Sequence, residues 1–126
     1  MSTPYQFNEY QEAWLRDLET TTAKQGPGFL RIEYDGVVAY CCLGRAEVAV
    51  DGHEPEATSV HLTRDLSDKL KLRTTWGHLF GPVTKNTRVF HSLDAMNDSG
   101  DWTFAEIAEF IRANPGKVFE DASPNG

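Results

Sequence analysis

Hydrophobic residues recur at helical spacing near the start of the chain. Within residues 8–22, Tyr10, Trp14 and Leu18 fall on one stripe that a helix would turn toward a core. Asn8 stands in an N-cap position, and Gln11 follows three residues later, which is the spacing of a capping box. The pattern predicts an amphipathic helix whose packing partners lie later in the sequence.

Other stretches also favour helices. Near the C-terminus, Thr103 and Glu106 form a second capping-box pattern ahead of an apolar face, and Pro115 ends that helix. The segment 73–83 contains two glycines, a proline and aromatic residues, so we predict a loop there that forms one wall of a pocket. The remaining predicted helices cover residues 43–52, 63–72 and 86–96. In the first of them the stretch "AEVAV" also fits a strand.

Alternation of apolar and polar residues predicts one β-hairpin. Residues 29–34 and 37–41 flank the pair Asp35-Gly36, which is a strong signal for a two-residue hairpin turn. The turn pairs Tyr34 with Val37, and the rest of the register follows from that pair. The two strands therefore share one apolar face.

The adjacent cysteines lie where this hairpin meets the next predicted helix. In the predicted register Cys41 falls opposite Leu30 on the apolar face, whereas Cys42 points the other way. Gly44 would allow the helix to approach the hairpin closely. We interpret the cysteine pair as a packing feature and expect Cys41 to belong to the core.

Length and composition limit the chain to one domain. Its 126 residues are 40% hydrophobic and 25% charged, values typical of a folded protein. Cysteines that are adjacent in sequence cannot cross-link distant segments. We predict a small single α+β domain over residues 1–126, with a β-hairpin packed by about four helices, an ordered core over about 5–118 and a flexible tail over 119–126.

The charge balance weighs against nucleic acid as a partner. The chain has 19 acidic and 12 basic residues, and its net charge of −7 repels a phosphate backbone. No apolar run approaches the roughly 20 residues that span a bilayer, and residues 1–10 lack a signal-peptide pattern. We expect no nucleic acid, no membrane and a cytoplasmic location. The densest basic group, which we interpret as a solvated face, is Lys69, Lys71, Arg73, Lys85 and Arg88.

Candidate catalytic and metal-binding residues lack the spacing that such sites need. Zinc sites use pairs such as C-x-x-C or H-x-x-x-H, which the sequence does not contain. Cys42 could start the helix that follows it, a position that can lower a thiol pKa, but no motif pairs it with a histidine. We therefore predict no catalytic residue, no metal and no cofactor. The histidines, which are well separated in the sequence, are His53, His61, His78 and His91.

Paired carboxylates offer an acid and a base but no partner signal. Glu54 lies close to Glu56 in the sequence, and Asp94 lies one helical turn before Asp98. Two carboxylates can share general acid and base roles. On an acidic chain such pairs are typical of solvated surface, so we interpret them in that way.

Several short blocks, in a fixed order, resemble one family of proteins. They are "KQGPGFL" at 24–30, "YCCLG" at 40–44 and "MNDSGDWTFAEIAEFI" at 96–111. The sequence thereby resembles a family of small phage- and prophage-encoded proteins with the patterns Q-G-x-G-x-L, Y-C-C-L-G, N-D-x-G and F-x-E-I-A. It differs at Arg45, where such proteins usually carry a valine. The resemblance implies a viral origin and no particular reaction.

Together the acidic domain and the resemblance favour a function in binding. We expect a small phage accessory protein in the host cytoplasm, which inhibits a host protein or sequesters a defence-related small molecule. An exposed patch or pocket should then lie near the candidate binding residues Tyr40, Cys42, Trp76 and His78.

Two other functions stay open at this point. One is a small hydrolase or nucleotide-cleaving enzyme that uses Cys42, or a His/Asp set such as His91 and Asp94. The other is a virion component that associates with copies of itself, since a homo-oligomer is compatible with this sequence.

Overall fold

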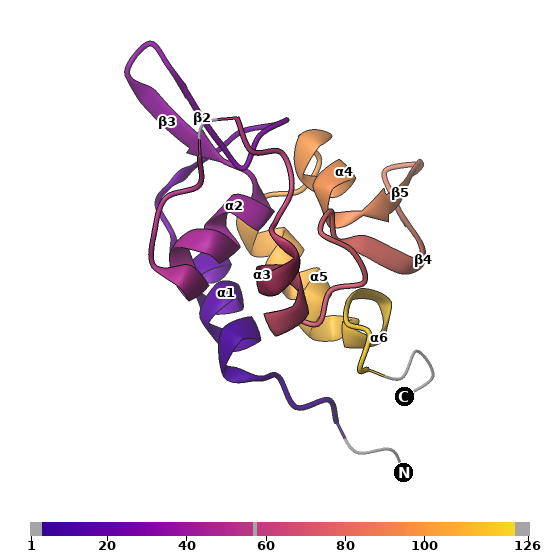
Figure 1. The fold of residues 1–126 in the computed structure, drawn as a ribbon. Coiled ribbons are helices and arrows are strands. Elements are labelled where there is room, and N and C mark those ends of the chain that lie inside the picture. The colour runs from indigo at the N-terminus through magenta and orange to yellow at the C-terminus, as the bar shows by residue number, and fades with distance from the viewer. Residues whose placement is uncertain (1–3, 57, 123–126) are drawn as a thin grey trace.

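Helices and two small sheets make up the computed structural model, which describes residues 4–56 and 58–122 (Figure 1). The predicted α+β class is confirmed. In chain order the elements are α1 Glu9–Thr20, β1 Lys24–Gln25, β2 Arg31–Tyr34, β3 Val37–Tyr40, α2 Cys42–Ala46, the π-helix η1 Glu47–Asp51, α3 Arg64–Lys69, β4 His78–Lys85, β5 Arg88–Ser92, α4 Leu93–Asp98, α5 Phe104–Ala113 and α6 Pro115–Val118.

The two helices with capping boxes, α1 and α5, pack against each other and organise the core. Both predicted boxes are confirmed: the side chains of Asn8 and Thr103 accept hydrogen bonds from the first turns of their helices. Helix α1 buries Trp14, Leu15 and Leu18. Burial of an amphipathic face, rather than helix propensity alone, holds helices of this length in place.

The first sheet has the order β1-β3-β2, and its hairpin projects from the body of the molecule (Figure 1). The predicted register is confirmed, because Tyr34 pairs with Val37 and Ile32 pairs with Ala39. Strand β1 adds to β3 in parallel.

Helix α2 starts directly at the end of the hairpin and passes very close to it. A Cβ atom at Gly44 would lie 1.9 Å from the backbone oxygen of Leu30, so only glycine fits there. The helix continues through η1 and ends at Gly52, whose φ of 75° closes it in the left-handed conformation. This confirms the helix predicted over 43–52 and the reason given for Gly44.

The segment from 73 to 96 differs from the prediction. Residues 78–85 form β4 rather than loop, and 88–92 form β5 rather than the first turns of a helix, so only α4 is helical. The connecting turn holds Asn86 at φ 52° and Thr87 at φ 65°. Hairpin turns of this kind usually carry glycine at the second position, so the Asn-Thr pair hid the hairpin signal.

The C-terminal segment packs further than predicted. Phe119 is fully buried and bridges Leu72, so the tail predicted from residue 119 starts too early. Tyr5 stacks on the Phe119 ring at 5.6 Å and donates a hydrogen bond to Asp121 at 2.6 Å. The last part of the predicted tail, residues 123–126, lies outside the described residues.

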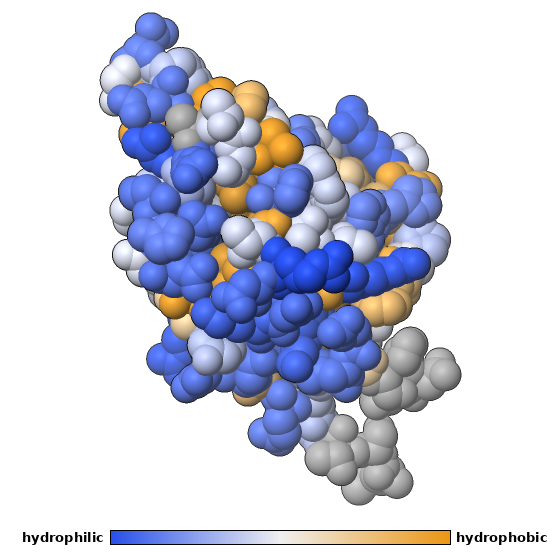
Figure 2. Space-filling model, in the orientation of Figure 1, coloured by the Kyte–Doolittle hydropathy of each residue, from blue (hydrophilic) through white to orange (hydrophobic). Residues whose placement is uncertain are grey.

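Most of the face in Figure 2 is hydrophilic. Hydrophobic atoms gather on it in a band from the base of the β2–β3 hairpin toward the middle. At the hairpin turn itself, the side chains of Tyr34 and Val37 are exposed. Within residues 4–56 and 58–122, every helix is too short or too polar to cross a bilayer.

Candidate functional site

The three sequence blocks singled out above meet at one buried side chain, Asn97, which is 3% exposed. Its Oδ1 accepts hydrogen bonds from Gln25 Nε2 at 2.9 Å and from the backbone N–H of Cys42 at 3.0 Å. Its Nδ2 donates to the Gly26 oxygen at 3.0 Å and to Asp98 Oδ1 at 3.2 Å. One amide therefore joins β1, the start of α2 and the end of α4.

The orientation of these amides is fixed by backbone groups. The N–H of Cys42 can only donate and the Gly26 carbonyl can only accept, so the Asn97 oxygen must face the former. Gln25 Nε2 donates its second hydrogen bond to the Trp102 carbonyl at 2.8 Å. Both amide groups have thus used every N–H that they possess.

A cavity of about 290 Å³ opens beside this junction; we call it the Gln25 cavity. Its wall combines the loop after β1 with the turn between α4 and α5. Asp98 braces that loop by accepting a hydrogen bond from the Gly28 N–H at 3.0 Å. The lining residues are Gln25, Gly26, Pro27, Asn97, Asp98, Gly100, Trp102 and Thr103.

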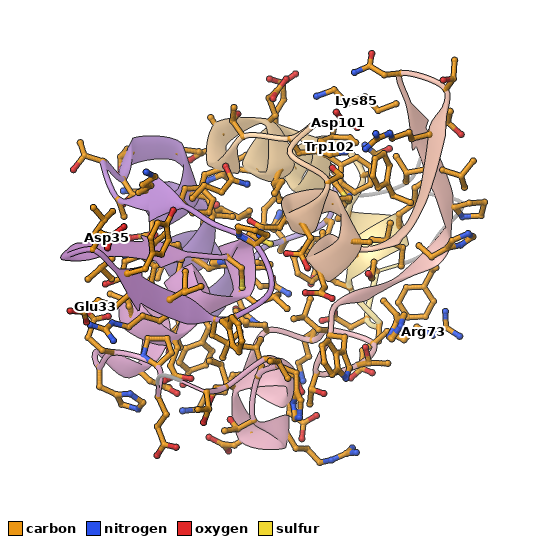
Figure 3. The ribbon with its side chains drawn as sticks, turned by 90° about the horizontal axis from the view of Figure 1, so that it is seen from above. Glu33, Asp35, Arg73, Lys85, Asp101 and Trp102 are labelled. Carbon is orange, nitrogen blue, oxygen red and sulfur yellow. The ribbon has the colours of Figure 1, made fainter. Side chains whose placement is uncertain are left out.

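Trp102 belongs to a second cavity as well, of about 340 Å³, which we call the Lys85 cavity. Lys85 Nζ lies 4.5 Å from the centroid of the Trp102 ring and donates to Glu106 Oε2 at 3.0 Å. It also donates to the Asp101 carbonyl at 2.5 Å. Figure 3 shows Lys85, Asp101 and Trp102 together at one corner, far from Glu33 on the hairpin. The cavity is lined by Lys85, Trp102, Glu106, Glu109, Phe110, Ala113 and Asn114.

The Trp102 side chain is held by aromatic contacts and has one unused polar group. Its ring meets Phe90 at 5.9 Å and Phe110 at 5.7 Å in edge-on geometry. The side chain is 8% exposed, and its indole N–H finds no acceptor among the described residues. A buried donor without a partner costs about 1–3 kcal/mol, so this corner is less well satisfied than the core.

Both cysteines are buried, which removes Cys42 from the list of accessible residues. Cys42 is 0% exposed, and burial raises the pKa of its thiol well above the ordinary value. Its Sγ lies 3.7 Å from the Leu93 oxygen. Cys41 caps α2 by accepting a hydrogen bond from Gly44, and burial raises its pKa to about 12. Neither thiol has the exposure or the low pKa that a nucleophile needs.

Tyr40, the last residue of β3, belongs to a separate polar network with Glu54 and Arg45. Its hydroxyl donates to Glu54 Oε1 at 2.6 Å, and burial followed by Glu54 raises the pKa of the phenol. Arg45 covers the Tyr40 ring at 4.7 Å and makes a two-fold pair with Asp17 at 2.7 Å. Arg45, the position that differs from the resembling family, is therefore a partner of Asp17 in α1.

Trp76 lies in the loop before β4, and His78 is the first residue of that strand. Trp76 is 36% exposed and its ring lies 5.0 Å from that of His61. His78 Nδ1 is 2.7 Å from Thr74 Oγ1. Thr74 in turn lines a polar cavity of about 190 Å³, together with Arg64, Ser67, Asp68, Leu72, Arg73, Thr75 and Glu120. Of the segment 73–83, only the first three residues line this cavity, and Trp76 and Phe80, the aromatic residues of the predicted wall, are not among its lining residues.

The four predicted binding residues thus do not share one site. Cys42 is buried, Tyr40 contacts Glu54 and Arg45, and Trp76 and His78 lie together, since the backbone N–H of each donates to the Thr74 hydroxyl.

The residues that line the Gln25 cavity all belong to the blocks at 24–30 and 96–111, and none of them is among the four predicted binding residues. Gln25 and Asn97 carry no charge and belong to no known ligand motif. The signal in the sequence was that the resemblance rests on these blocks together, which is expected when segments distant in sequence meet in the fold.

A histidine–carboxylate contact in the described part of the chain is that of His53 Nδ1 with Glu47 Oε2, at 3.2 Å. His91 and Asp94, the pair considered for a hydrolase, share no hydrogen bond there. Partial burial, followed by the charge of Asp98, raises the pKa of Asp94 to about 6. Among residues 4–56 and 58–122, no group of three or more His, Cys, Asp or Glu side chains could hold a metal ion.

Three of the five residues in the predicted basic group form ion pairs with carboxylates. Lys69 lies 3.5 Å from a carboxylate oxygen of Asp51 and 3.5 Å from one of Asp65. Lys85 is paired with Glu106, and Arg88 lies 3.3 Å from Asp101. Neutralised cations of this kind give little attraction for a phosphate backbone.

Compared with known proteins, the chain matches no family model, no curated protein and no solved structure. The resemblance to phage-encoded proteins therefore stays a prediction based on the quoted blocks.

Proposed function

We propose that this protein acts by binding and not by catalysis, and that it sequesters a small molecule in the Gln25 cavity. The observation that carries the proposal is the cavity itself, whose wall joins two distant segments, 25–27 and 97–103, through the hydrogen bonds of Asn97. Cavities of roughly 300 Å³ and more, with an aromatic wall and a few polar groups, are the usual form of small-molecule sites.

The setting that we propose is the cytoplasm of a phage-infected host. The block pattern suggests a phage-encoded accessory protein, and retention of a defence-related molecule requires only a binding site. The buried thiols support binding over the hydrolytic alternative that uses Cys42, and within residues 4–56 and 58–122 His91 and Asp94 share no hydrogen bond. A sequestering protein needs no reactive group, only a cavity and enough copies of the chain.

The test uses the purified full chain, mixed with the low-molecular-weight fraction of phage-infected cells and analysed by native mass spectrometry. We expect one retained molecule per chain. Pro27→Trp should abolish retention, because Pro27 is exposed and lines the cavity, so a large side chain there blocks it without entering the core. The matched control is Pro82→Trp on β4, an exposed proline outside the cavity.

Two results would contradict the proposal. One is a bare chain after incubation with fractions from several hosts. The other is equal retention by Pro27→Trp and the unchanged protein, which would place the ligand elsewhere.

Inhibition of a host protein is a second candidate, favoured by the exposed apolar tip of the β2–β3 hairpin. There Tyr34 is 52% exposed and Val37 is 38% exposed. Exposed aromatic and aliphatic side chains at a projecting tip are typical of contact surfaces. If this candidate holds, Tyr34→Ser should release a host protein that co-purifies with the chain, whereas Pro27→Trp should not.

A further inference from the structure

The Gln25 cavity has an unequal supply of hydrogen-bonding groups. Both amide N–H groups of Gln25 and of Asn97 are already used within the protein. The backbone N–H of Gly26 donates to the Tyr40 oxygen, and that of Thr103 donates to Glu106. The donors named here are therefore not available to a ligand, and the Trp102 indole N–H, which has no acceptor among the described residues, is buried.

Unused acceptors, in contrast, remain at the same wall. Within residues 4–56 and 58–122, no hydrogen bond uses Gln25 Oε1 or Asp98 Oδ2. Asp98 is an exposed residue, and its Oδ1 alone holds the Gly28 and Asn97 donors. A carbonyl oxygen and an ionised carboxylate oxygen can both accept hydrogen bonds from a ligand and can donate none.

The charge of the cavity also disfavours an anionic ligand. Of its eight lining residues, Asp98 is the only charged one. Asp94 lies one helical turn before Asp98 on α4, and the two carboxylates share one negative environment. A phosphate or carboxylate ligand would meet repulsion there and would find no cation to pair with.

The other side of the same corner shows which chemistry the Trp102 ring accepts. In the Lys85 cavity a cation already lies over that ring, and it donates to a carbonyl oxygen and to a carboxylate. The Gln25 cavity offers two of these elements, the Gln25 carbonyl oxygen and the Asp98 carboxylate, and Trp102 is among its lining residues. No Lys or Arg side chain of the described residues lines it.

We propose that the Gln25 cavity takes a flat ligand group that donates hydrogen bonds and carries a positive charge, such as an amidinium or guanidinium group. This inference rests on the proposed function and specifies the ligand class of the same site. The cavity volume of about 290 Å³ fits one ring with its substituent. Cations over tryptophan faces, paired with a carboxylate, are an established mode of recognition.

The first test titrates the full chain with two probes of the same shape and opposite charge, benzamidinium and benzoate. Binding is followed by two-dimensional ¹H–¹⁵N NMR spectra, which report each backbone and indole N–H separately. Benzamidinium should shift the signals of Gln25, Asp98 and Trp102 saturably, with at least tenfold higher affinity than benzoate. Equal or tighter binding of benzoate would overturn the proposal, and so would benzamidinium shifts confined to other residues.

Two controls separate the site from general attraction of cations to an acidic protein. Tetramethylammonium carries the charge but cannot donate a hydrogen bond, so it should bind at least tenfold more weakly than benzamidinium. Asp98→Asn should weaken benzamidinium binding about tenfold while keeping an acceptor for Gly28. Glu109→Gln, in the Lys85 cavity, removes a charge of the same sign and should leave the affinity unchanged.

The ligand class and the proposed function can fail separately. If the cell fraction supplies an anionic molecule that shifts the Trp102 signals, the ligand class is wrong and the function in binding stands. If neither the probes nor any cell fraction shifts the signals of the cavity, both are wrong.

Discussion

Two tryptophans of similar burial have opposite surroundings. Trp14 is 0% exposed, and its indole N–H donates to the Cys42 oxygen at 2.8 Å. Trp102 is 8% exposed, has no acceptor for its N–H among the described residues and lies between two cavities. We call the surroundings of Trp14 the satisfied core, because its indole N–H is hydrogen-bonded. We call the surroundings of Trp102 the Trp102 corner, where an N–H group stays without an acceptor among the described residues.

This difference indicates where stability and binding are located in the molecule. The hydrogen bonds of Asn97 satisfy buried groups from three segments, so any loss there leaves polar atoms buried and unpaired. The indole N–H of Trp102, by contrast, has no acceptor among the described residues, so a substitution there breaks no hydrogen bond of that group. We expect substitutions to separate the two regions by their effect on the free energy of unfolding.

The largest effect is expected for Asn97→Ala, which would leave the Cys42 N–H and the Gly26 carbonyl without their partner. The free energy of unfolding should fall by about 3–5 kcal/mol, measured by urea denaturation. The control is Asn114→Ala, which removes a single hydrogen bond to Phe110 and should cost about 1 kcal/mol or less. Similar losses in the two variants would contradict the central role of Asn97.

The second prediction compares the two indoles directly. Trp14→Phe removes a satisfied buried hydrogen bond and ring volume, and should cost about 2–3 kcal/mol. Trp102→Phe keeps a ring between Phe90 and Phe110 and removes a donor that has no acceptor, so the cost should be about 1 kcal/mol or less. If Trp102→Phe is the more destabilising variant, the contrast between the regions is wrong.

A smaller effect is expected for the two buried cysteines, which lie in the core beside Trp14. Cys41→Ser places a hydroxyl in a site that is 2% exposed and should cost about 1 kcal/mol or more. Both thiols should also react with a disulfide reagent far more slowly in the native protein than in urea. An unchanged melting temperature for Cys41→Ser, or fast reaction of a native thiol, would show that this region is less well packed than described.

The smallest effect concerns pH and comes from Asp94 on α4. Partial burial, then the charge of Asp98, raises the pKa of Asp94 from 3.8 to about 6. Asp94 therefore favours the folded state when it is protonated, and that contribution is lost as the pH rises through about 6.

Asp94→Asn removes this loss. After allowance for solvent screening, it should raise the free energy of unfolding by about 1 kcal/mol at pH 7 and leave it unchanged near pH 3.5. Urea denaturation at the two pH values measures the difference, with the exposed Asp65→Asn as control. A gain at low pH and none at pH 7 would reverse the sign and disprove the assignment.

Local signals were sufficient for much of the fold. The capping boxes at Asn8 and Thr103 and the Asp-Gly turn after Tyr34 are complete within a few residues, so sequence spacing alone indicates the structure. The β4–β5 hairpin escaped prediction because Asn86 and Thr87 adopt positive φ without a glycine. Contacts of the strands with α4 and α6 hold that turn in place, and such contacts are not visible in a local pattern.

The candidate site depended on tertiary structure almost entirely. By itself the sequence determined the two helices with capping boxes, the first hairpin, the packing role of Cys41 and a close approach at Gly44, whereas only the structure shows that a Cβ atom does not fit there. Only the tertiary structure decided that Gln25, Asn97 and Trp102 meet, because their hydrogen bonds join residues more than 70 positions apart in the chain. A side-chain amide can bond to any buried backbone group that comes near, so its partners follow from the folded arrangement and not from its neighbours in sequence.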